Sequence, residues 1–213
     1  MKTVLLPVKD FRNAKQRLSS VLDADSRLGL ARSMLADVLS ALARTHVPDR
    51  VVIFTAEDEA VRMARSFGFD VEIENSVEGH SAAVNRMVVQ LSAGASRILS
   101  IASDLPKLSP SEVDFVLDAA SEPITLIPSR DGTGTNGVVF IPPGRITMEY
   151  GEGSFSRHMS KAAAAGHHAA VLNVPGIAFD IDTPEDLREF RDDPRKDSET
   201  WRYLLNQSLP WKV

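Results

Sequence analysis

Short apolar runs alternate with amphipathic stretches along the first 122 residues, and this order constrains the fold more than any other feature. Four runs have the length of buried strands: residues 3–8, 50–55, 71–74 and 97–102. Helical spacing of apolar residues occurs between them, over residues 26–43, 57–67 and 81–93. Strands that alternate with helices form parallel sheets with helices on both faces. The sequence therefore predicts an α/β domain.

The pattern changes after residue 122, where strands follow one another more closely. We expect strands at residues 124–128, 137–141, 169–174 and 176–180, and helices that begin near Ser109, Ser154 and Thr183. Closely spaced strands indicate an antiparallel addition to the sheet. Both tryptophans, Trp201 and Trp211, lie in the tail after residue 193. A terminal helix packed on the body would bury them, and a homodimer contact is the alternative.

Composition is that of a globular protein. The chain has 213 residues, 43% of them hydrophobic and 25% charged, which suffices for one domain with a real core. No apolar run is long enough for a membrane span, and the first seven residues fit a strand better than a signal peptide. Cysteine is absent, which excludes disulfides and thiolate chemistry. The net charge of −5 argues against sequence-independent nucleic-acid binding. We expect a single cytoplasmic domain over residues 1–213, with neither nucleic acid nor membrane as a partner.

Two acidic segments, far apart in the sequence, each follow an apolar run. Asp104 follows the fourth run, whereas Asp180 and Asp182 follow the run that begins at Gly176. Ligands of open α/β sheets bind at the carboxyl ends of strands, so we expect the three carboxylates to meet there. Such carboxylates repel one another unless a cation joins them, and their oxygens suit Mg²⁺. Alternatively, Asp182 only assists the cap of the helix at Thr183, and Asp180 faces solvent.

A basic stretch follows the first predicted strand directly. Lys9, Arg12, Lys15 and Arg17 place four cations within nine residues. Such a stretch would match the negative charges of a nucleoside triphosphate. A solvated helix face is the alternative. The phosphate interpretation is favoured because the stretch should emerge at the same sheet edge as Asp104.

Residues 132–137 match the G-x-G-x-x-G pattern of dinucleotide-binding loops. That fingerprint requires a helix after the loop, whereas an apolar run typical of a strand follows here, so we reject the dinucleotide interpretation. The loop could still bind an anion through its backbone N–H groups and the hydroxyls of Thr133 and Thr135. A tight turn before a strand is the alternative.

A second glycine-containing segment, residues 150–158, precedes a predicted helix. Glycines at a helix N-terminus let an anion approach the backbone donors, so Ser154 is either an ordinary cap or an anion ligand. We interpret His158 as a support for this helix. The sequence shows neither a serine in a nucleophile elbow nor a His-x-x-x-His spacing.

Five segments in this order resemble the CofC/FbiD family of guanylyltransferases, which activate a phosphorylated three-carbon acid in the biosynthesis of the deazaflavin coenzyme F420. The segments are Pro7-Val8-Lys9 with Lys15-Gln16-Arg17-Leu18, Ser103-Asp104-Leu105-Pro106, Gly132-Thr133-Gly134-Thr135-Asn136, Tyr150-Gly151 with Ser154 and His158, and Asp180-Ile181-Asp182-Thr183-Pro184. The resemblance covers nearly the whole chain. It implies a single-domain Rossmann-like nucleotidyltransferase of the glycosyltransferase-A type, with a mostly parallel mixed sheet flanked by helices on both faces.

The resemblance also implies roles for individual residues. Positions that match the family's ligands of one or two Mg²⁺ ions are Asp104, Asp180 and Asp182. Positions that match the phosphoacid site are Thr135, Gly151 and Ser154. The nucleotide would be held by Lys9, Arg12, Lys15, Asn85 and Asp104. The catalytic groups would be Lys9, Lys15 and Asp104.

The implied reaction is the transfer of GMP from GTP to the phosphate of 2-phospho-L-lactate, phosphoenolpyruvate or 3-phospho-D-glycerate, with release of pyrophosphate. The attacking phosphate is already an anion at neutral pH, so the step needs no general base. This agrees with the lack of a Ser–His or Cys–His arrangement in the sequence. A homodimer and a hand-off of the product to the next enzyme of the pathway are further expectations.

The residues leave rival functions to weigh. Molybdopterin guanylyltransferases and sugar-phosphate cytidylyltransferases usually have a glycine-rich loop after the first strand, whereas residues 7–15 contain no glycine. A glycosyltransferase could also use the D-x-D pattern of Asp180 and Asp182, but it would release no pyrophosphate. A non-catalytic nucleotide-binding protein would have no reason to keep three acids beside a basic loop.

Overall fold

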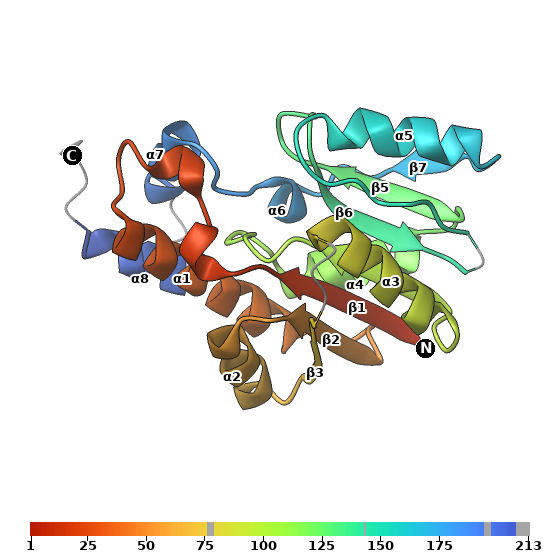
Figure 1. Cartoon of the computed structure of the whole chain (residues 1–213), viewed down its shortest axis with the longest axis horizontal. Helices are drawn as coiled ribbons and strands as arrows, with labels where there is room; N and C mark the ends of the chain where they lie inside the picture. The colour runs from red at the N-terminus through yellow and green to blue at the C-terminus, as the bar shows by residue number, and fades with distance from the viewer. Residues whose placement is uncertain (76–78, 143, 194–196, 208–213) are drawn as a thin grey trace.

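The computed structural model describes residues 1–75, 79–142, 144–193 and 197–207. Within them, seven strands form one mixed sheet in the order β3-β2-β1-β4-β6-β5-β7 (Figure 1). Their bounds are Lys2–Val8 (β1), Arg50–Thr55 (β2), Asp70–Ile73 (β3), Arg97–Ile101 (β4), Ile124–Pro128 (β5), Thr135–Phe140 (β6) and Ala169–Val171 (β7). Strands β1 to β4 are parallel, and β6 runs antiparallel to β4 and β5. The predicted antiparallel addition is therefore confirmed.

Helices cover both faces of the sheet because the strands are apolar on both sides. On β1, Val4, Leu6 and Val8 pack into one core cluster and Leu5 into the other. One face carries α1 (Ala24–Leu42), α2 (Asp58–Ser66) and α4 (Pro110–Ala119). The opposite face carries α3 (His80–Ser92) and α5 (Ser154–Ala164). Among the described residues, no helix combines the length and the apolar composition that a membrane crossing requires.

The carboxyl ends of β1 and β4 lie at one edge of the sheet, together with the start of β6. The reversed direction of β6 brings its first residues beside the end of β4, where Ile101 pairs with Gly137. One residue further, the backbone N–H of Ala102 donates to the Asn136 carbonyl at 2.9 Å. This edge therefore gathers the loops after β1 and β4 and the glycine-rich loop before β6.

The strand predicted at residues 176–180 does not form. The chain instead makes the single helical turn α6 (Pro175–Ala178) and becomes extended at Phe179. The backbone N–H of Gly176 donates to Glu112 Oε1 at 2.6 Å, and Asn136 Nδ2 donates to the Ile177 and Ala178 carbonyls at 3.1 and 3.2 Å. These partners are distant in sequence, so the apolar run alone gave no sign of the turn. A proline at the first helical position also favours it.

Gly176→Ala is expected to lower the free energy of unfolding by about 1–3 kcal/mol, the usual cost of overpacking. An added Cβ would collide with Glu112 Oε2 and would lie 2.6 Å from the Lys107 carbonyl oxygen. Denaturant titration measures the effect. Gly94→Ala is the matched control, because nothing lies within 4 Å of a Cβ added there. Equal stability of the two variants would contradict the close packing of α6.

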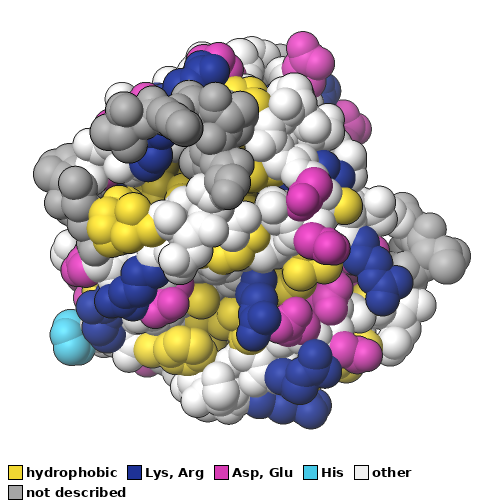
Figure 2. Space-filling model, turned by 90° about the vertical axis from the view of Figure 1, so that its left-hand side faces the viewer, with side chains coloured by type: hydrophobic (Ala, Val, Ile, Leu, Met, Phe, Trp, Pro, Cys, Tyr) yellow, Lys and Arg dark blue, Asp and Glu magenta, His cyan; other side chains and the backbone are white. Residues whose placement is uncertain are grey.

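The two helices α7 (Pro184–Arg191) and α8 (Glu199–Leu205) lie with α1 at one end of the molecule (Figure 1). Tyr203 on α8 donates from its hydroxyl to the Ser26 carbonyl at 3.0 Å, and its ring lies against Gly29, where a Cβ would not fit. Trp201 and Tyr203 pack against a third core cluster, which includes Leu30 of α1, Leu187 of α7 and Leu204 of α8. Trp211 lies outside the described residues. On the face drawn in Figure 2, Lys and Arg side chains are interspersed with Asp and Glu.

Candidate active site

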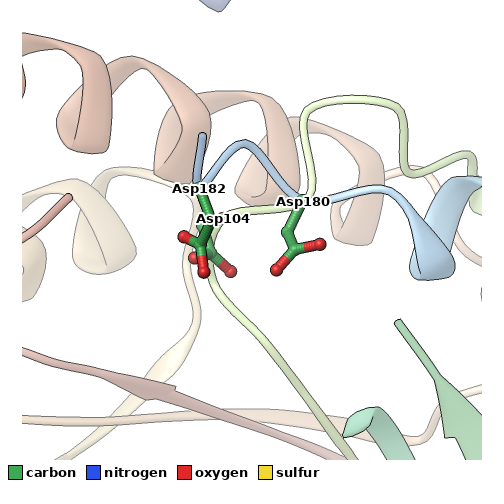
Figure 3. A group of neighbouring side chains, drawn as sticks. All are labelled: Asp104, Asp180 and Asp182. Carbon is green, nitrogen blue, oxygen red and sulfur yellow. The ribbon is translucent and has the colours of Figure 1, made fainter. Parts of the chain in front are cut away.

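Three carboxylates from two distant segments meet at the sheet edge described above (Figure 3). Asp104 follows β4, and Asp180 and Asp182 lie between α6 and α7. One oxygen from each carboxylate lies within 4.8 Å of the other two. Figure 3 shows the three side chains converging from two separate stretches of backbone. Three carboxylate oxygens at this spacing form a donor set that suits a hard divalent cation.

The cap of α7 is made by Thr183 rather than by Asp182. The Thr183 side chain accepts from the Asp186 N–H at 3.2 Å, and the Asp186 side chain accepts from the Thr183 N–H at 2.8 Å. Asp182 contributes only its backbone N–H to this capping box, through a 3.1 Å bond to Asp186 Oδ2. The Asp182 carboxylate therefore remains available to the acidic cluster.

Lys15 joins two of the three acids. Its Nζ lies 2.5 Å from Asp104 Oδ2 and 2.7 Å from Asp182 Oδ1, and its side chain is only 5% exposed. The Lys15 backbone has φ 54° and ψ 40°, and it is the one non-glycine residue with positive φ among those that the structure describes. This left-handed residue precedes the short helix η2 (Gln16–Leu18). Strained backbone conformations of this kind cluster at functional sites.

The charges of the cluster shift one another's ionisation. Burial, followed by the neighbouring Asp104 and Asp182 carboxylates, raises the pKa of Asp180 to about 7. Burial also opposes ionisation of Asp104, but the Lys15 ammonium outweighs it and lowers the pKa of Asp104 below its usual value. Burial disfavours the charge on Lys15 as well, yet the two carboxylates raise the pKa of Lys15 well above its ordinary range. An additional cation would favour the ionised form of Asp180.

A cavity of ≈ 890 Å³ opens beside the acidic cluster. This volume lies in the range of small-molecule pockets. The predicted site residues that line it are Lys9, Lys15, Asp104, Thr135, Gly151, Ser154, Asp180 and Asp182. The structure therefore brings the basic stretch, the acids and the two glycine-containing segments to one space.

Two residues of the predicted set, Arg12 and Asn85, do not line this cavity. The side-chain amide of Asn85 instead pairs with the backbone of Met148, accepting from its N–H at 2.7 Å and donating to its carbonyl at 3.0 Å. Arg12 is exposed in the short helix η1 (Phe11–Asn13). The roles of both residues toward a nucleotide stay predictions.

The glycine-rich loop before β6 uses its own donors and forms a tight turn. Asp131 Oδ1 accepts from the Thr133 N–H at 3.0 Å, and Ser129 Oγ accepts from the Gly134 N–H at 2.7 Å. The Thr133 hydroxyl donates to Asp131 Oδ2 at 2.7 Å. Hydrogen bonds from Ser129, and then from Thr133, lower the pKa of Asp131 to about 2. The predicted alternative of a tight turn is therefore present, and Ser129 and Asp131 use three of the donors of the loop. Anion binding through the other donors of the loop, among them the Thr135 hydroxyl, stays a prediction.

Ser154 is not the cap of its helix. The cap position belongs to Gly153, whose φ of 68° is left-handed, and no side chain caps the first turn of α5. Ser154 is buried and lines the cavity, and its N–H donates to the Gly151 carbonyl at 3.1 Å. Of the two interpretations that the sequence left open, the structure excludes the ordinary cap.

Sequence reasoning gave no role at the cavity to several residues that shape it, although Asn136, Tyr150 and His158 stand in the segments that carry the family resemblance. His80 and Tyr150 line the cavity with their rings 5.6 Å apart. His158 is fully buried behind it and bonds Thr135, and Asn136 holds the turn that precedes Asp180. The signal for each is a tertiary contact, which a single sequence does not contain.

The comparisons with known proteins decide the family. The model of the family described as "Guanylyl transferase CofC like" matches residues 1–204. The chain belongs to this family. A phosphoenolpyruvate guanylyltransferase of Conexibacter woesei is 38% identical over 214 residues, which cover 96% of this chain and 95% of the relative. A 2-phospho-L-lactate guanylyltransferase of Methanothermobacter thermautotrophicus is 33% identical over 190 residues, covering 89% of this chain and 84% of the relative.

The fold of this CofC-like chain is shared with solved structures, one of which is described as a nucleotidyl transferase and superposes with a TM-score of 0.59 at 15% identity. A Desulfovibrio desulfuricans protein, described as a nucleotide-diphospho-sugar transferase, superposes with a TM-score of 0.76. The match covers 96% of this chain and 94% of that chain at 20% identity, so it shows a common fold and nothing about function. The predicted fold class and the enzyme class of guanylyltransferase are confirmed.

Proposed function

We propose that this protein transfers GMP from GTP to the phosphate of a small phosphorylated acid and releases pyrophosphate, in the biosynthesis of coenzyme F420. The acceptor would be 2-phospho-L-lactate, phosphoenolpyruvate or 3-phospho-D-glycerate. The observation that carries the proposal is the convergence of Asp104, Asp180 and Asp182 with Lys15 beside a cavity of ≈ 890 Å³. Two relatives, each named for a phosphoacid of this kind, support the acceptor class.

The acidic cluster fits Mg²⁺, because all three donors are carboxylate oxygens and they lie within 4.8 Å of one another. Asp104, Asp180 and Asp182 would hold one or two ions. Bound Mg²⁺ supplies positive charge that neutralises the triphosphate and stabilises the pyrophosphate as it leaves.

The protein's own groups position the reactants and neutralise their charge. An oxygen of the acceptor phosphate forms a bond to the α-phosphorus of GTP. The bond from that phosphorus to the bridging oxygen breaks, and pyrophosphate leaves with the electron pair. Lys9 and Lys15, with Arg12, would face the β- and γ-phosphates, while Thr135, Gly151 and Ser154 would hold the phosphoacid. In-line placement and charge stabilisation suffice for such a step, since the nucleophile needs no deprotonation.

The proposal is tested by offering the purified full chain each acceptor with GTP, ATP or CTP in the presence of Mg²⁺. Pyrophosphate and the coupled product are both measured. We expect pyrophosphate only when GTP, Mg²⁺ and one of the phosphoacids are present together. L-lactate, which lacks the phosphate, is the matched control and should give none. Pyrophosphate release at the same rate with and without an acceptor would contradict the proposal. So would the lack of product with every combination of nucleotide and phosphoacid.

The homodimer and the hand-off of product to a following enzyme stay predictions. Light scattering on the purified chain, with and without GTP, measures the first of them. A monomer under both conditions would contradict it.

A further inference from the structure

His158 makes two hydrogen bonds that together determine its protonation. Its Nε2 accepts from the backbone N–H of Glu149 at 2.9 Å. Its Nδ1 lies 2.9 Å from Thr135 Oγ1. His158 is fully buried and Thr135 is 7% exposed, so water does not compete for these bonds. His158 lies on α5 and Thr135 on β6, so regular secondary structure holds both residues in place.

The Glu149 N–H leaves one tautomer compatible with this geometry. A backbone N–H can only donate, so Nε2 carries no hydrogen and accepts. A neutral imidazole must then carry its hydrogen on Nδ1, which donates to Thr135 Oγ1. The imidazolium would place two hydrogens face to face at Nε2. Burial, and then the charges of Arg157 and Lys161, also lower the pKa of His158 to about 4.

The direction of this bond determines what Thr135 can do in the cavity. A hydroxyl oxygen that accepts from His158 keeps its own hydrogen free for a different partner. Thr135 lines the cavity, as Ser154 does, whereas His158 does not. The hydroxyl is therefore prepared to donate to an oxygen of a bound anion, and charge-assisted bonds of this kind are the strong ones.

We propose that His158 is a positioning residue that holds the Thr135 hydroxyl as a hydrogen-bond donor to the anionic acceptor. The inference rests on the proposed function for the identity of that acceptor. It assigns His158 a part in acceptor affinity without contact to any reacting atom. The Thr135 hydroxyl would also contribute to acceptor specificity, because a buried donor disfavours any ligand that leaves it without a hydrogen-bond partner.

Two conservative variants separate the two bonds of His158. In His158→Asn, the side-chain amide can replace Nδ1 as the donor to Thr135 but loses the acceptor for Glu149. In His158→Gln, the longer amide can replace Nε2 as the acceptor and loses the donor to Thr135. We expect His158→Gln to raise the KM of the phosphoacid about tenfold with kcat nearly unchanged, the mark of lost uniform binding. His158→Asn should keep this KM within about threefold of wild type, and the KM of GTP should not move in either variant.

A double-mutant cycle with Thr135→Val excludes a merely structural role. Thr135→Val should raise the phosphoacid KM about tenfold, and adding His158→Gln should raise it no further. Independent, multiplying effects would overturn the inference. Equal effects of His158→Asn and His158→Gln on the phosphoacid KM would also overturn it.

Nitrogen NMR of the histidine-labelled full chain tests the tautomer without any substrate. The ring nitrogens of His158, assigned by their loss in His158→Gln, should show hydrogen on Nδ1 alone at neutral pH. Hydrogen on Nε2, or on both nitrogens, would overturn the inference even if the variants fail to fold. If the wild type makes no product with any phosphoacid, the proposed function fails, while the NMR result still decides the state of His158.

Discussion

Asp104→Asn is expected to lower turnover at least about hundredfold at saturating GTP, acceptor and Mg²⁺, the scale on which lost transition-state charge stabilisation acts. The variant keeps the size of the side chain and removes its charge. Asp104 is the acid that follows β4, and it is bonded to Lys15 at 2.5 Å within the cluster of three carboxylates. Steady-state pyrophosphate release measures kcat directly, and Asp182→Asn should lose activity on the same scale.

The matched control for this result is Asp118→Asn on α4. Asp118 is also a lysine-paired aspartate, with Lys2 Nζ at 2.7 Å, but its side chain is 58% exposed and it does not line the cavity. We expect its turnover to stay within about twofold of wild type, as for most surface substitutions. If the turnover of Asp104→Asn were close to that of Asp118→Asn, the proposed role of Asp104 as a Mg²⁺ ligand would be contradicted.

Lys15→Met is expected to produce the second large loss, again about hundredfold in kcat. The substitution keeps most of the apolar stem and removes the ammonium that bonds Asp104 and Asp182 at 2.5 and 2.7 Å. Without this charge, the GTP triphosphate loses one of its proposed cationic partners. Three carboxylates within 4.8 Å of one another also lack their internal counter-ion.

The unfolding temperature gives a second readout for Lys15→Met that does not depend on catalysis. Because the variant leaves the acids unneutralised, we expect it to unfold at a lower temperature than wild type in Mg²⁺-free buffer. Mg²⁺ should then raise its unfolding temperature more than it raises that of wild type. Lys2→Met, at the opposite end of β1, is the control and should show neither effect. A Mg²⁺ response equal to that of wild type would contradict a shared cation site.

Local patterns in the sequence predicted most helices and strands because their causes are local. The capping boxes at Ser109 and Thr183 form as expected, since each joins residues three positions apart. The strand after the glycine-rich loop also forms, as β6. The apolar run that ends at Phe179 misled the prediction, because a Glu112 carboxylate 64 residues away binds the backbone of Gly176 and favours a helical turn.

Side-chain partners across the fold were the part that the sequence could not reveal. Asn85 stands on a helix that could face the cavity, yet its amide pairs with the Met148 backbone. His158 lies 23 residues from Thr135 in the sequence, and only the fold brings Thr135 Oγ1 within 2.9 Å of its Nδ1. Three of the donors of the glycine-rich loop are used by Ser129 and Asp131, whose bonds depend on the turn that the loop adopts.

The sequence by itself predicted the α/β class, the family and the acidic and basic residues of the candidate site, because periodicity, capping and motif order are properties of the chain. Only the tertiary structure decided that the carboxylates of Asp104, Asp180 and Asp182 meet, and that the Lys15 ammonium bonds Asp104 and Asp182. It also decided which hydroxyls face the cavity and which donors are already used. The physical reason is that charge interactions and hydrogen bonds depend on distances between atoms, and folding sets those distances for residues far apart along the chain.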